Sequence, residues 1–215
     1  MKAVCYYNHF GFDSPPNSIF ERWIDSFSKN GFEPVILNES DAREHPLFDK
    51  VNELISKLPT VNNPEYERAC WLRWLAYRQL APAFFTDIDV INYGFKPDDV
   101  QTQLPMYSHY TYASPAAVYA TGDAIDSFID NFSKARFWIN PVNGVDHVSD
   151  MIAFHRCYGG IFSGHCCDSC YPDAMTFPLV HFGNSSVPRE WAFNKRYLAI
   201  DDLSKRRRKY EIESK

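Results

Sequence analysis

Residues 83–92 read Ala-Phe-Phe-Thr-Asp-Ile-Asp-Val-Ile-Asn, an aromatic and β-branched run with two carboxylates two positions apart. Such a composition is typical of a buried β-strand, in which side chains alternate between the two faces. Asp87 and Asp89 are therefore expected to point the same way at or near a strand end. Neighbouring carboxylates repel each other unless a cation lies between them, and Mg²⁺ or Mn²⁺ prefers oxygen ligands. The run predicts a metal–diphosphate site, with a solvated strand end as the alternative.

The segments before this run predict a βαβ unit. Residues 2–8 are apolar enough for a buried strand, and residues 19–27 carry apolar side chains at helical spacing. Gly31 fits a helix stop, and residues 34–38 fit a second strand. A strand, a helix and a strand in close succession favour a parallel sheet.

Further elements extend this alternation over the rest of the chain. Helices are expected over residues 47–58, 64–80, 123–135 and 145–157, strands over 116–120 and 176–183, and a Gly-, Cys- and Ser-rich loop over 159–172. The predicted fold class is α/β, with a mixed, mostly parallel central sheet flanked by helices. Residues 1–204 would form a single domain, and residues 205–215 a basic C-terminal tail or the start of a linker.

Composition narrows the functional classes. The 215 residues are 45% hydrophobic and 16% aromatic, which suits a single core and clefts that stack rings against flat ligands. The net charge of −5 argues against wholesale nucleic-acid binding. The basic cluster at residues 205–209 fits a solvated helix face, a contact with an anionic membrane surface or a link to a further domain.

Targeting and redox signals point to the cytoplasm. No apolar run approaches the roughly 18 residues that span a bilayer, and residues 1–8 become polar too soon for a signal peptide. The six cysteines are not spaced as a disulfide framework. We therefore expect a soluble, cytoplasmic protein without a transmembrane segment, able to lie at the periphery of a membrane.

A helix that carries Arg68, Arg73 and Arg78 precedes the Asp-x-Asp strand, and this order resembles the GT-A class of nucleotide-sugar glycosyltransferases. The resemblance implies a GT-A-like catalytic domain with a Rossmann-like N-terminal βαβ unit. It implies Asp89 as a direct ligand of Mn²⁺ or Mg²⁺, and Asp87 as a water-mediated ligand or a contact to the ribose or sugar. Arg73 matches an arginine found before the Asp-x-Asp in some of these families. Alternatively, Arg73 has no functional role: its aliphatic chain covers the sheet while its guanidinium group stays in solvent.

Residues 181–191, His-Phe-Gly-Asn-Ser-Ser-Val-Pro-Arg-Glu-Trp, look like the H-F-x-G-x-x-K-P-W segment of glycogenin-like retaining glycosyltransferases. That resemblance implies His181 as the third metal ligand, with a structural histidine as the alternative. Gly183 would let backbone N–H groups approach a phosphate. Val187 replaces the lysine of the segment, and the remaining candidates for a phosphate contact are Arg189, Lys195 and Arg196.

Two further pairs of residues complete the expected site. GT-A enzymes often place a carboxylate at the start of a helix facing the acceptor, and Asp150, followed by Asp146, is the candidate here for a base or an orienting group. Alternatively, Asp150 and Asp146 only stabilise the helix by interacting with the positive end of its dipole. Tyr6 and Asn8 follow the first strand, where such folds stack and read the nucleobase.

The resulting expectation is a metal-dependent glycosyltransferase. It would move a hexosyl or deoxyhexosyl group from a nucleotide diphosphate sugar, most commonly a UDP-sugar, to a glycan or glycoconjugate acceptor. The metal would act as Lewis acid and template for the leaving diphosphate.

Two alternatives stay open. Residues 84–90 also fit the Asp-x-Asp strand of haloacid-dehalogenase-like phosphatases, with Asp87 as nucleophile, Asp89 as acid/base, and Asp201 and Asp202 as the later acidic pair. The other is a zinc-containing binding module, since Cys167 and Cys170 have a zinc-like spacing. The remaining candidate zinc ligands are Cys157, His165 and Cys166, with His155 nearby.

Overall fold

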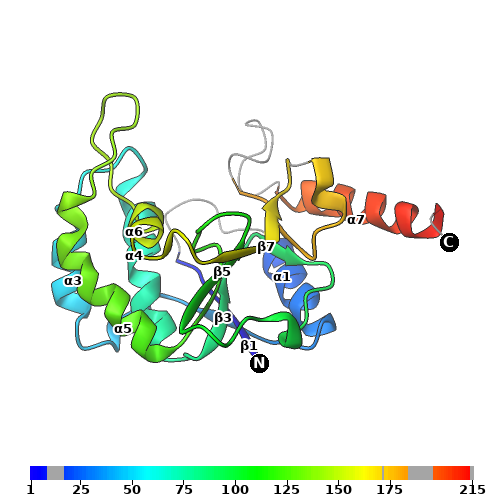
Figure 1. The fold of residues 1–215 in the computed structure, drawn as a ribbon, viewed down its shortest axis with the longest axis horizontal. Coiled ribbons are helices and arrows are strands. Elements are labelled where there is room, and N and C mark those ends of the chain that lie inside the picture. Colours follow the sequence, from blue (N-terminus) through cyan, green and yellow to red (C-terminus); the bar gives the residue numbers. More distant parts are fainter. Residues whose placement is uncertain (9–16, 171, 184–195, 214–215) are drawn as a thin grey trace.

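The structure, a computed structural model, describes residues 1–8, 17–170, 172–183 and 196–213. Strands and helices alternate along the chain (Figure 1). The strands are β1 (Lys2–Tyr6), β2 (Glu33–Leu37), β3 (Ala83–Thr86), β4 (Val90–Asn92), β5 (Met106–Tyr110), β6 (Ala117–Ala120), β7 (Phe162–Asp168) and β8 (Leu179–His181). The α-helices are α1 (Asn17–Lys29), α2 (Glu39–Arg43), α3 (Phe48–Ile55), α4 (Pro64–Arg78), α5 (Gly122–Asp130), α6 (Asp150–Tyr158) and α7 (Arg196–Glu213). Short 3₁₀ segments are η1 (Pro97–Asp99), η2 (Asn131–Phe137) and η3 (Pro172–Met175).

The described strands form one mixed sheet in the order β2-β1-β3-β6-β5-β7-β8-β4. Strand β1 is parallel to both β2 and β3, so the predicted βαβ unit is confirmed. Strand β6 runs antiparallel to β3 and β5, whereas β7 is parallel to β5 and β8. Strand β4 pairs with β8 in antiparallel orientation. The α/β class is confirmed, while the narrower GT-A assignment stays a prediction.

The link between β3 and β4 requires the sheet to curl. Only residues 87–89 separate the two strands, although β4 lies five places from β3 in the sheet order. In a flat sheet, a spacing of about 4.8 Å per strand would put them about 24 Å apart. The chain from Thr86 to Val90 can reach at most about 14 Å. The sheet therefore bends round until its β8–β4 edge returns to the end of β3, and Asp87 and Asp89 lie at that junction.

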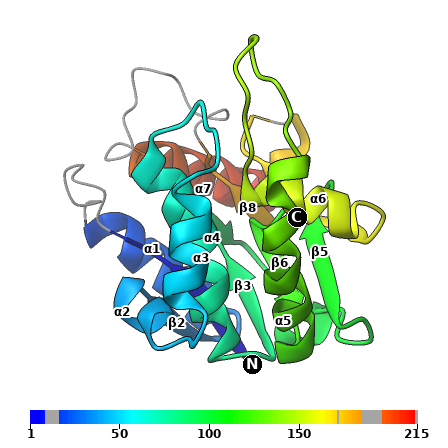
Figure 2. The same ribbon diagram turned by 90° about the vertical axis from the view of Figure 1, so that its left-hand side faces the viewer.

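Strand alternation gives the sheet two apolar faces. Phe85 and Val118 pack with Trp74 on the face covered by α2–α6. Phe84 packs on the opposite face, where Trp23 of α1 is fully buried. The arrangement of α3, α4 and α5 over one face is visible in Figure 2. Each buried aromatic side chain contributes on the order of 2–3 kcal/mol of hydrophobic stabilisation.

Two sequence-based boundaries near the site were wrong. Residues 159–172 contain strand β7, not only a loop, because neighbouring β5 and β8 supply its ladder and its small Cys166 and Cys167 side chains are fully buried. The helix expected from residue 145 begins at Asp150, because the Ser149 side chain caps it by accepting a hydrogen bond from the Ile152 amide at 3.2 Å. Residues 138–149 precede that helix as a loop.

Other boundaries agree more closely. Pro64 opens α4 at its first position, as expected, and Gly31 follows α1 with a positive φ of 86°. Strand β5 was not predicted. Helix α7 continues without a break through the predicted boundary between residues 204 and 205. None of the described helices is long and apolar enough to cross a membrane.

Candidate metal centre

Asp87 and Asp89 lie in a tight turn after β3 and not within the strand itself. The Val90 amide donates to the Asp87 carbonyl at 3.1 Å, which closes the turn. Two neighbouring segments fix it: the Asp87 amide donates to Ala116 at 3.0 Å, and the Phe182 amide donates to the Asp89 carbonyl at 2.9 Å. The predicted strand geometry is thus replaced by a clamped turn, which still brings the two carboxylates together.

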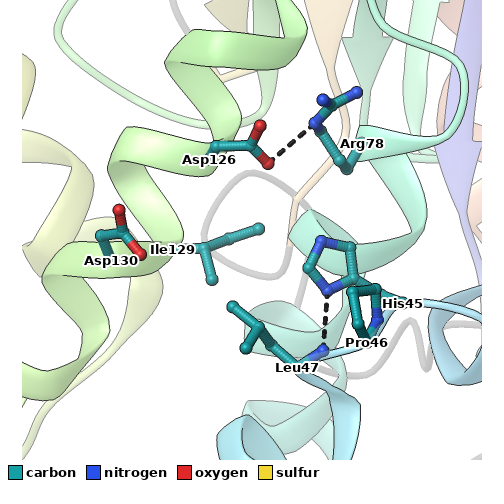
Figure 3. Close-up of a pocket in the computed structure, with 7 residues that line it drawn as sticks. All are labelled: His45, Pro46, Leu47, Arg78, Asp126, Ile129 and Asp130. Carbon is teal, nitrogen blue, oxygen red and sulfur yellow. Dashed lines mark hydrogen bonds and ion pairs between the residues drawn. The ribbon is translucent and has the colours of Figure 1, made fainter.

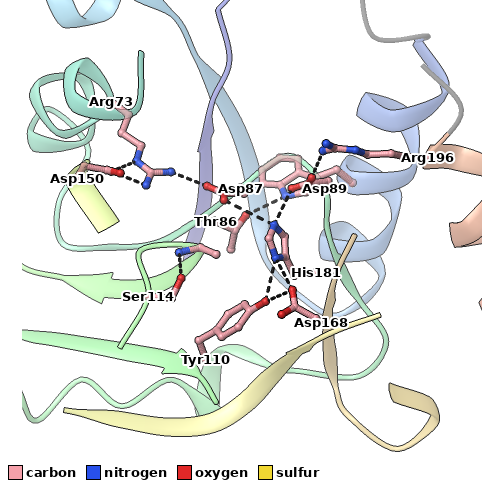
Figure 4. Close-up of polar contacts among 12 residues, drawn as sticks. Arg73, Thr86, Asp87, Asp89, Tyr110, Ser114, Asp150, Asp168, His181 and Arg196 are labelled. Carbon is pink, nitrogen blue, oxygen red and sulfur yellow. Dashed lines mark hydrogen bonds and ion pairs between the residues drawn. The ribbon is translucent and has the colours of Figure 1, made fainter. Parts of the chain in front are cut away.

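Both carboxylates face the imidazole of His181 (Figure 4). The Nε2 atom of His181 lies 3.4 Å from Asp89 Oδ1 and 3.8 Å from Asp87 Oδ2. One ligand atom from each of the three residues lies within 4.8 Å of the other two. Among the described residues, this is the one group of three or more His, Cys, Asp or Glu side chains that could hold a metal ion. Two carboxylates and an imidazole suit Mn²⁺ or Mg²⁺, so the donor set fits the predicted metal.

Asp168 and Tyr110 fix the orientation of His181. The Nδ1 atom of His181 lies 3.0 Å from Asp168 Oδ1 and 2.9 Å from the Tyr110 hydroxyl, which also donates to Asp168. With a proton on Nδ1 shared with Asp168, the lone pair of Nε2 faces the two acids. A carboxylate that orients a ligating histidine in this way is a recurrent feature of metal sites.

The surrounding acids also determine the protonation of His181. Burial alone would lower its pKa, but Asp89, Asp168 and Asp87 together raise the pKa to about 10. Imidazolium is therefore the form that the bare cluster favours, because it supplies positive charge between carboxylates. A cation bound to Nε2 would supply that charge in place of the proton.

Gly183 leaves room for the His181 ring. A Cβ atom at position 183 would lie 2.5 Å from His181 Cε1 and 3.0 Å from Nε2, closer than real Cβ contacts. The close approach of the His181 ring thus explains why position 183 is a glycine, which the sequence alone did not indicate. Its expected role in phosphate approach stays a prediction.

Two arginines hold the outer oxygens of the Asp-x-Asp pair. Arg73, 7% exposed on α4, donates from Nη1 to Asp87 Oδ1 at 2.6 Å. Arg196 donates from Nη1 to Asp89 Oδ2. Because of Arg196 and His181, the pKa of Asp89 is lowered despite its burial. The structure places Arg73 beside Asp87, and its expected contact with the donor stays a prediction.

Asp150 anchors the other side of Arg73. Its Oδ2 accepts from Arg73 Nε at 2.9 Å, from Arg73 Nη2 at 2.5 Å and from Trp74 Nε1 at 3.1 Å. The residue is 3% exposed, and burial raises the pKa of its carboxyl against the attraction of Arg73. Asp150 thus reaches the metal centre through Arg73.

The cluster is deficient in positive charge when His181 is neutral. Arg73 pairs with Asp87 and Asp150, Arg196 pairs with Asp89, and Asp168 contacts His181, so four carboxylates share two guanidinium groups. One divalent cation would balance the remaining two negative charges.

The other predicted site residues are placed less directly. Tyr6 ends β1 beside β3, and Asn8 Nδ2 donates to Glu39 at 3.0 Å. The Tyr6 hydroxyl is buried without a hydrogen-bond partner among the described residues, and burial raises its pKa. Asp146 is exposed in the loop 138–149 and makes no hydrogen bond or ion pair with the described residues of the cluster. Arg189 lies outside the described residues.

The further residues that the two alternatives invoke, beyond Asp87 and Asp89, make other contacts. Asp201 on α7 forms an ion pair with Arg22 on α1 at 2.7 Å, and Asp202 pairs with Arg206. Cys166 and Cys167 are buried in β7, whereas Cys170 is exposed. Within the described part of the chain, Asp201, Asp202 and the cysteines of the zinc alternative belong to no group of three or more side chains that could hold a metal ion.

A hollow of about 430 Å³ lies near the carboxyl end of α4, away from Asp87 (Figure 3). Arg78 and Asp126 form an ion pair across it at 2.7 Å, and His45 Nδ1 accepts from the Leu47 amide at 3.2 Å. Asp130 also lines the hollow, but among the described residues its side chains form no group that could hold a metal ion as the one around His181 does.

Asp168 and Tyr110 are the members of the centre that sequence reasoning missed. Asp168 pairs directly with His181 across β7 and β8, but the strand that carries it was interpreted as a loop. Comparison with known proteins adds no assignment: no family model matches the chain, and no curated protein matches it.

Proposed function

We propose that the protein is a metal-dependent glycosyltransferase that uses a nucleotide diphosphate sugar as donor, with UDP as the commonest nucleotide. One observation carries the proposal: Asp87, Asp89 and His181 offer three ligand atoms within 4.8 Å of one another. The GT-A assignment of the fold belongs to this proposal and is supported by the three parallel strands β2, β1 and β3 at one edge of the sheet.

The position of the cluster supports a nucleotide ligand. Ligands of open α/β sheets bind outside the carboxyl ends of the parallel strands, and both Tyr6 and Asp87 lie at that edge. The donor's base would lie toward Tyr6 and Asn8, and its diphosphate toward Asp87 and Asp89.

The protein's own residues would prepare this site before the donor arrives. Asp87, Asp89 and His181 would hold Mn²⁺ or Mg²⁺, which when bound supplies Lewis-acid stabilisation of the leaving diphosphate. Asp168 and Tyr110 keep Nε2 of His181 directed at the acids. Arg73 fixes the Asp87 carboxylate, which lowers the reorganisation needed for binding.

We propose a role for Asp150 that differs from the general base expected from the sequence. Its Oδ2 already accepts three hydrogen bonds, and only 3% of the residue is exposed. We assign it the positioning of Arg73, and through Arg73 that of Asp87. Whether an acceptor hydroxyl loses its proton to Asp150 or to another group is decided by the pH profile of the Asp150→Asn variant.

A thermal-shift titration with MnCl₂, UDP and UDP-sugars tests the proposal. A donor present at 100 times its Kd stabilises the fold by about 2.7 kcal/mol, which raises Tm by roughly 5–10 °C for a chain of this size. Asp89→Asn should abolish the part of the shift that requires Mn²⁺. Asp126→Asn, which alters an acid in the distant Arg78 ion pair, should leave it intact. Absence of any Mn²⁺-dependent nucleotide shift in the wild-type protein would refute the proposal.

A further inference from the structure

A second groove lies beside the candidate metal centre. Its volume is about 390 Å³, within the roughly 300–1,000 Å³ of small-molecule pockets. Helix α6 forms one wall through Met151, His155 and Arg156, Tyr112 from the chain after β5 forms another, and Asn140 comes from the loop 138–149.

Two aromatic contacts connect this groove to the metal centre. The ring of Tyr112 lies 4.8 Å from that of Tyr110, which lies 5.7 Å from the His181 ring. On the helix side, Met151 directly follows Asp150, the anchor of Arg73. A ligand in the groove would therefore be a neighbour of a donor bound at the cluster.

The groove and the expected nucleoside position lie on opposite sides of β3. Strand β1, with Tyr6, neighbours β3 on one side, whereas β6 and β5 follow on the other. Tyr112 follows β5 and so belongs to the second side. The position suits the acceptor, because the sugar being transferred would lie between the two ligands.

The charge of the groove selects among acceptors. Arg156 is exposed and makes no ion pair with any described residue. None of the described residues that line the groove is Asp or Glu, although the chain carries a net charge of −5. An unopposed guanidinium in an otherwise acidic protein favours an anionic group on the ligand.

The remaining walls suit a sugar ring. Tyr112 is 41% exposed and Met151 is 47% exposed, so both present apolar surface to the groove. An aromatic face can cover the C–H face of a pyranose, and the Asn140 amide offers both donors and an acceptor for hydroxyl groups. The backbone of Asn140 is held in place by its hydrogen bond to the His147 carbonyl at 2.8 Å.

We propose that this groove is the acceptor subsite and that it takes a sugar carrying an anionic group, either a phosphate or a carboxylate. The proposal rests on the proposed glycosyltransferase function. Arg156 binds the anionic group, Tyr112 and Met151 contact the ring, and Asn140 binds a ring hydroxyl.

Methyl NMR on protein labelled with ¹³C at its methionine methyl groups tests this directly. Met151 reports on the groove, and the buried Met106 serves as an internal control. The probes are α-D-glucose 1-phosphate, methyl β-D-glucuronide, neutral methyl β-D-glucoside and inorganic phosphate, each titrated without Mn²⁺ or nucleotide. We expect one or both anionic sugars to shift the Met151 signal and to bind at least about tenfold more tightly than the neutral sugar. The phosphate and glucuronide arms distinguish the two kinds of anionic group.

Arg156→Gln should weaken the anionic sugar by about tenfold and leave the neutral sugar unchanged. Arg136→Gln is the matched control, because Arg136 is also exposed but packs on Phe137 outside the groove. Equal affinities for charged and neutral sugars, binding of inorganic phosphate alone, or an Arg156→Gln protein that binds like the wild type would each overturn the proposal. Because no metal or nucleotide is present, this result is independent of the Mn²⁺-dependent donor shift. Failure of the donor shift with intact groove binding would overturn the transferase assignment and with it the acceptor role of the groove, and would leave a binding site for anionic sugars.

Discussion

The imidazole of His181 occupies space that any side chain at position 183 would need, since a Cβ there would lie 2.5 Å from Cε1. The ring is held from behind by Asp168 and Tyr110, so it cannot retreat without breaking those hydrogen bonds. Gly183 thus sets the position of the imidazole relative to Asp87 and Asp89.

Gly183→Ala should therefore weaken metal binding while the fold persists. Displacement of a ligating imidazole by a few tenths of an ångström or more is expected to cost about 10–100-fold in Mn²⁺ affinity. Isothermal titration with MnCl₂ measures this effect. Gly160→Ala is the control, because a Cβ at position 160 meets nothing within 4 Å. Equal Mn²⁺ affinity in the two variants would show that Gly183 does not set the imidazole position.

Asp168→Asn should also weaken the metal site, although Asp168 is not proposed as a ligand. The side-chain amide introduced at position 168 favours a proton on His181 Nδ1 less than the carboxylate does, so the ring is no longer held in one tautomer. We expect a loss of about 10–100-fold in Mn²⁺ affinity, and a smaller loss for Tyr110→Phe. The imidazole ¹⁵N shifts of His181 should change in parallel. Unaltered shifts and affinity would remove Asp168 from the account.

Arg73→Met should destabilise the protein by about 3–5 kcal/mol, because it leaves the buried Asp150 carboxylate without its partner. The double variant Arg73→Met/Asp150→Leu should recover part of this loss, since no buried charge is then uncompensated. Urea unfolding of the two single variants and the double variant measures the coupling. Strictly additive losses would contradict a direct Arg73–Asp150 interaction.

Glu67 provides a pH-dependent test on α4. The residue is 5% exposed, and burial, followed by repulsion from Asp150, raises its pKa to about 7. A carboxyl whose pKa is higher in the folded state binds more protons when folded, so stability falls as the pH rises from about 4.5 to about 7. The contribution is on the order of 3 kcal/mol and is fully present below pH 4.5.

Glu67→Gln removes this titration and should be more stable than the wild type at pH 8, with the difference disappearing near pH 4.5. Its amide can keep an acceptor toward Asn62, which now donates to Glu67 at 2.9 Å. Urea midpoints across pH 4.5–8 measure the difference. A pH-independent offset between the two proteins would mean that Glu67 does not titrate in this range.

The sequence analysis identified the site residues that local sequence patterns indicate. It missed those that are brought to the site only by the pairing of distant strands. The run at 83–92 and the βαβ unit carry local signals, and they led to Asp87, Asp89 and a parallel sheet. Asp168 has no such signal, because it meets His181 only through the pairing of β7 with β8. Strand β7 is rich in Gly, Ser and Cys, and its neighbours rather than its own propensity make it a strand.

For Asp150, likewise, the sequence predicted the position in the chain but not the contacts. Its place at a helix start was predicted from sequence, but the burial that turns its carboxylate toward Arg73 depends on how α6 packs against α4. The turn at 87–89 likewise follows from closure of the curled sheet, which no local pattern encodes.

The most direct test of the account is anomalous diffraction from crystals grown with MnCl₂ and UDP. We predict a manganese peak within about 2.0–2.6 Å of His181 Nε2 and of a carboxylate oxygen of Asp87 or Asp89. A map with no peak at these atoms, in which Arg73 and Arg196 still hold the two acids, would contradict the metal centre.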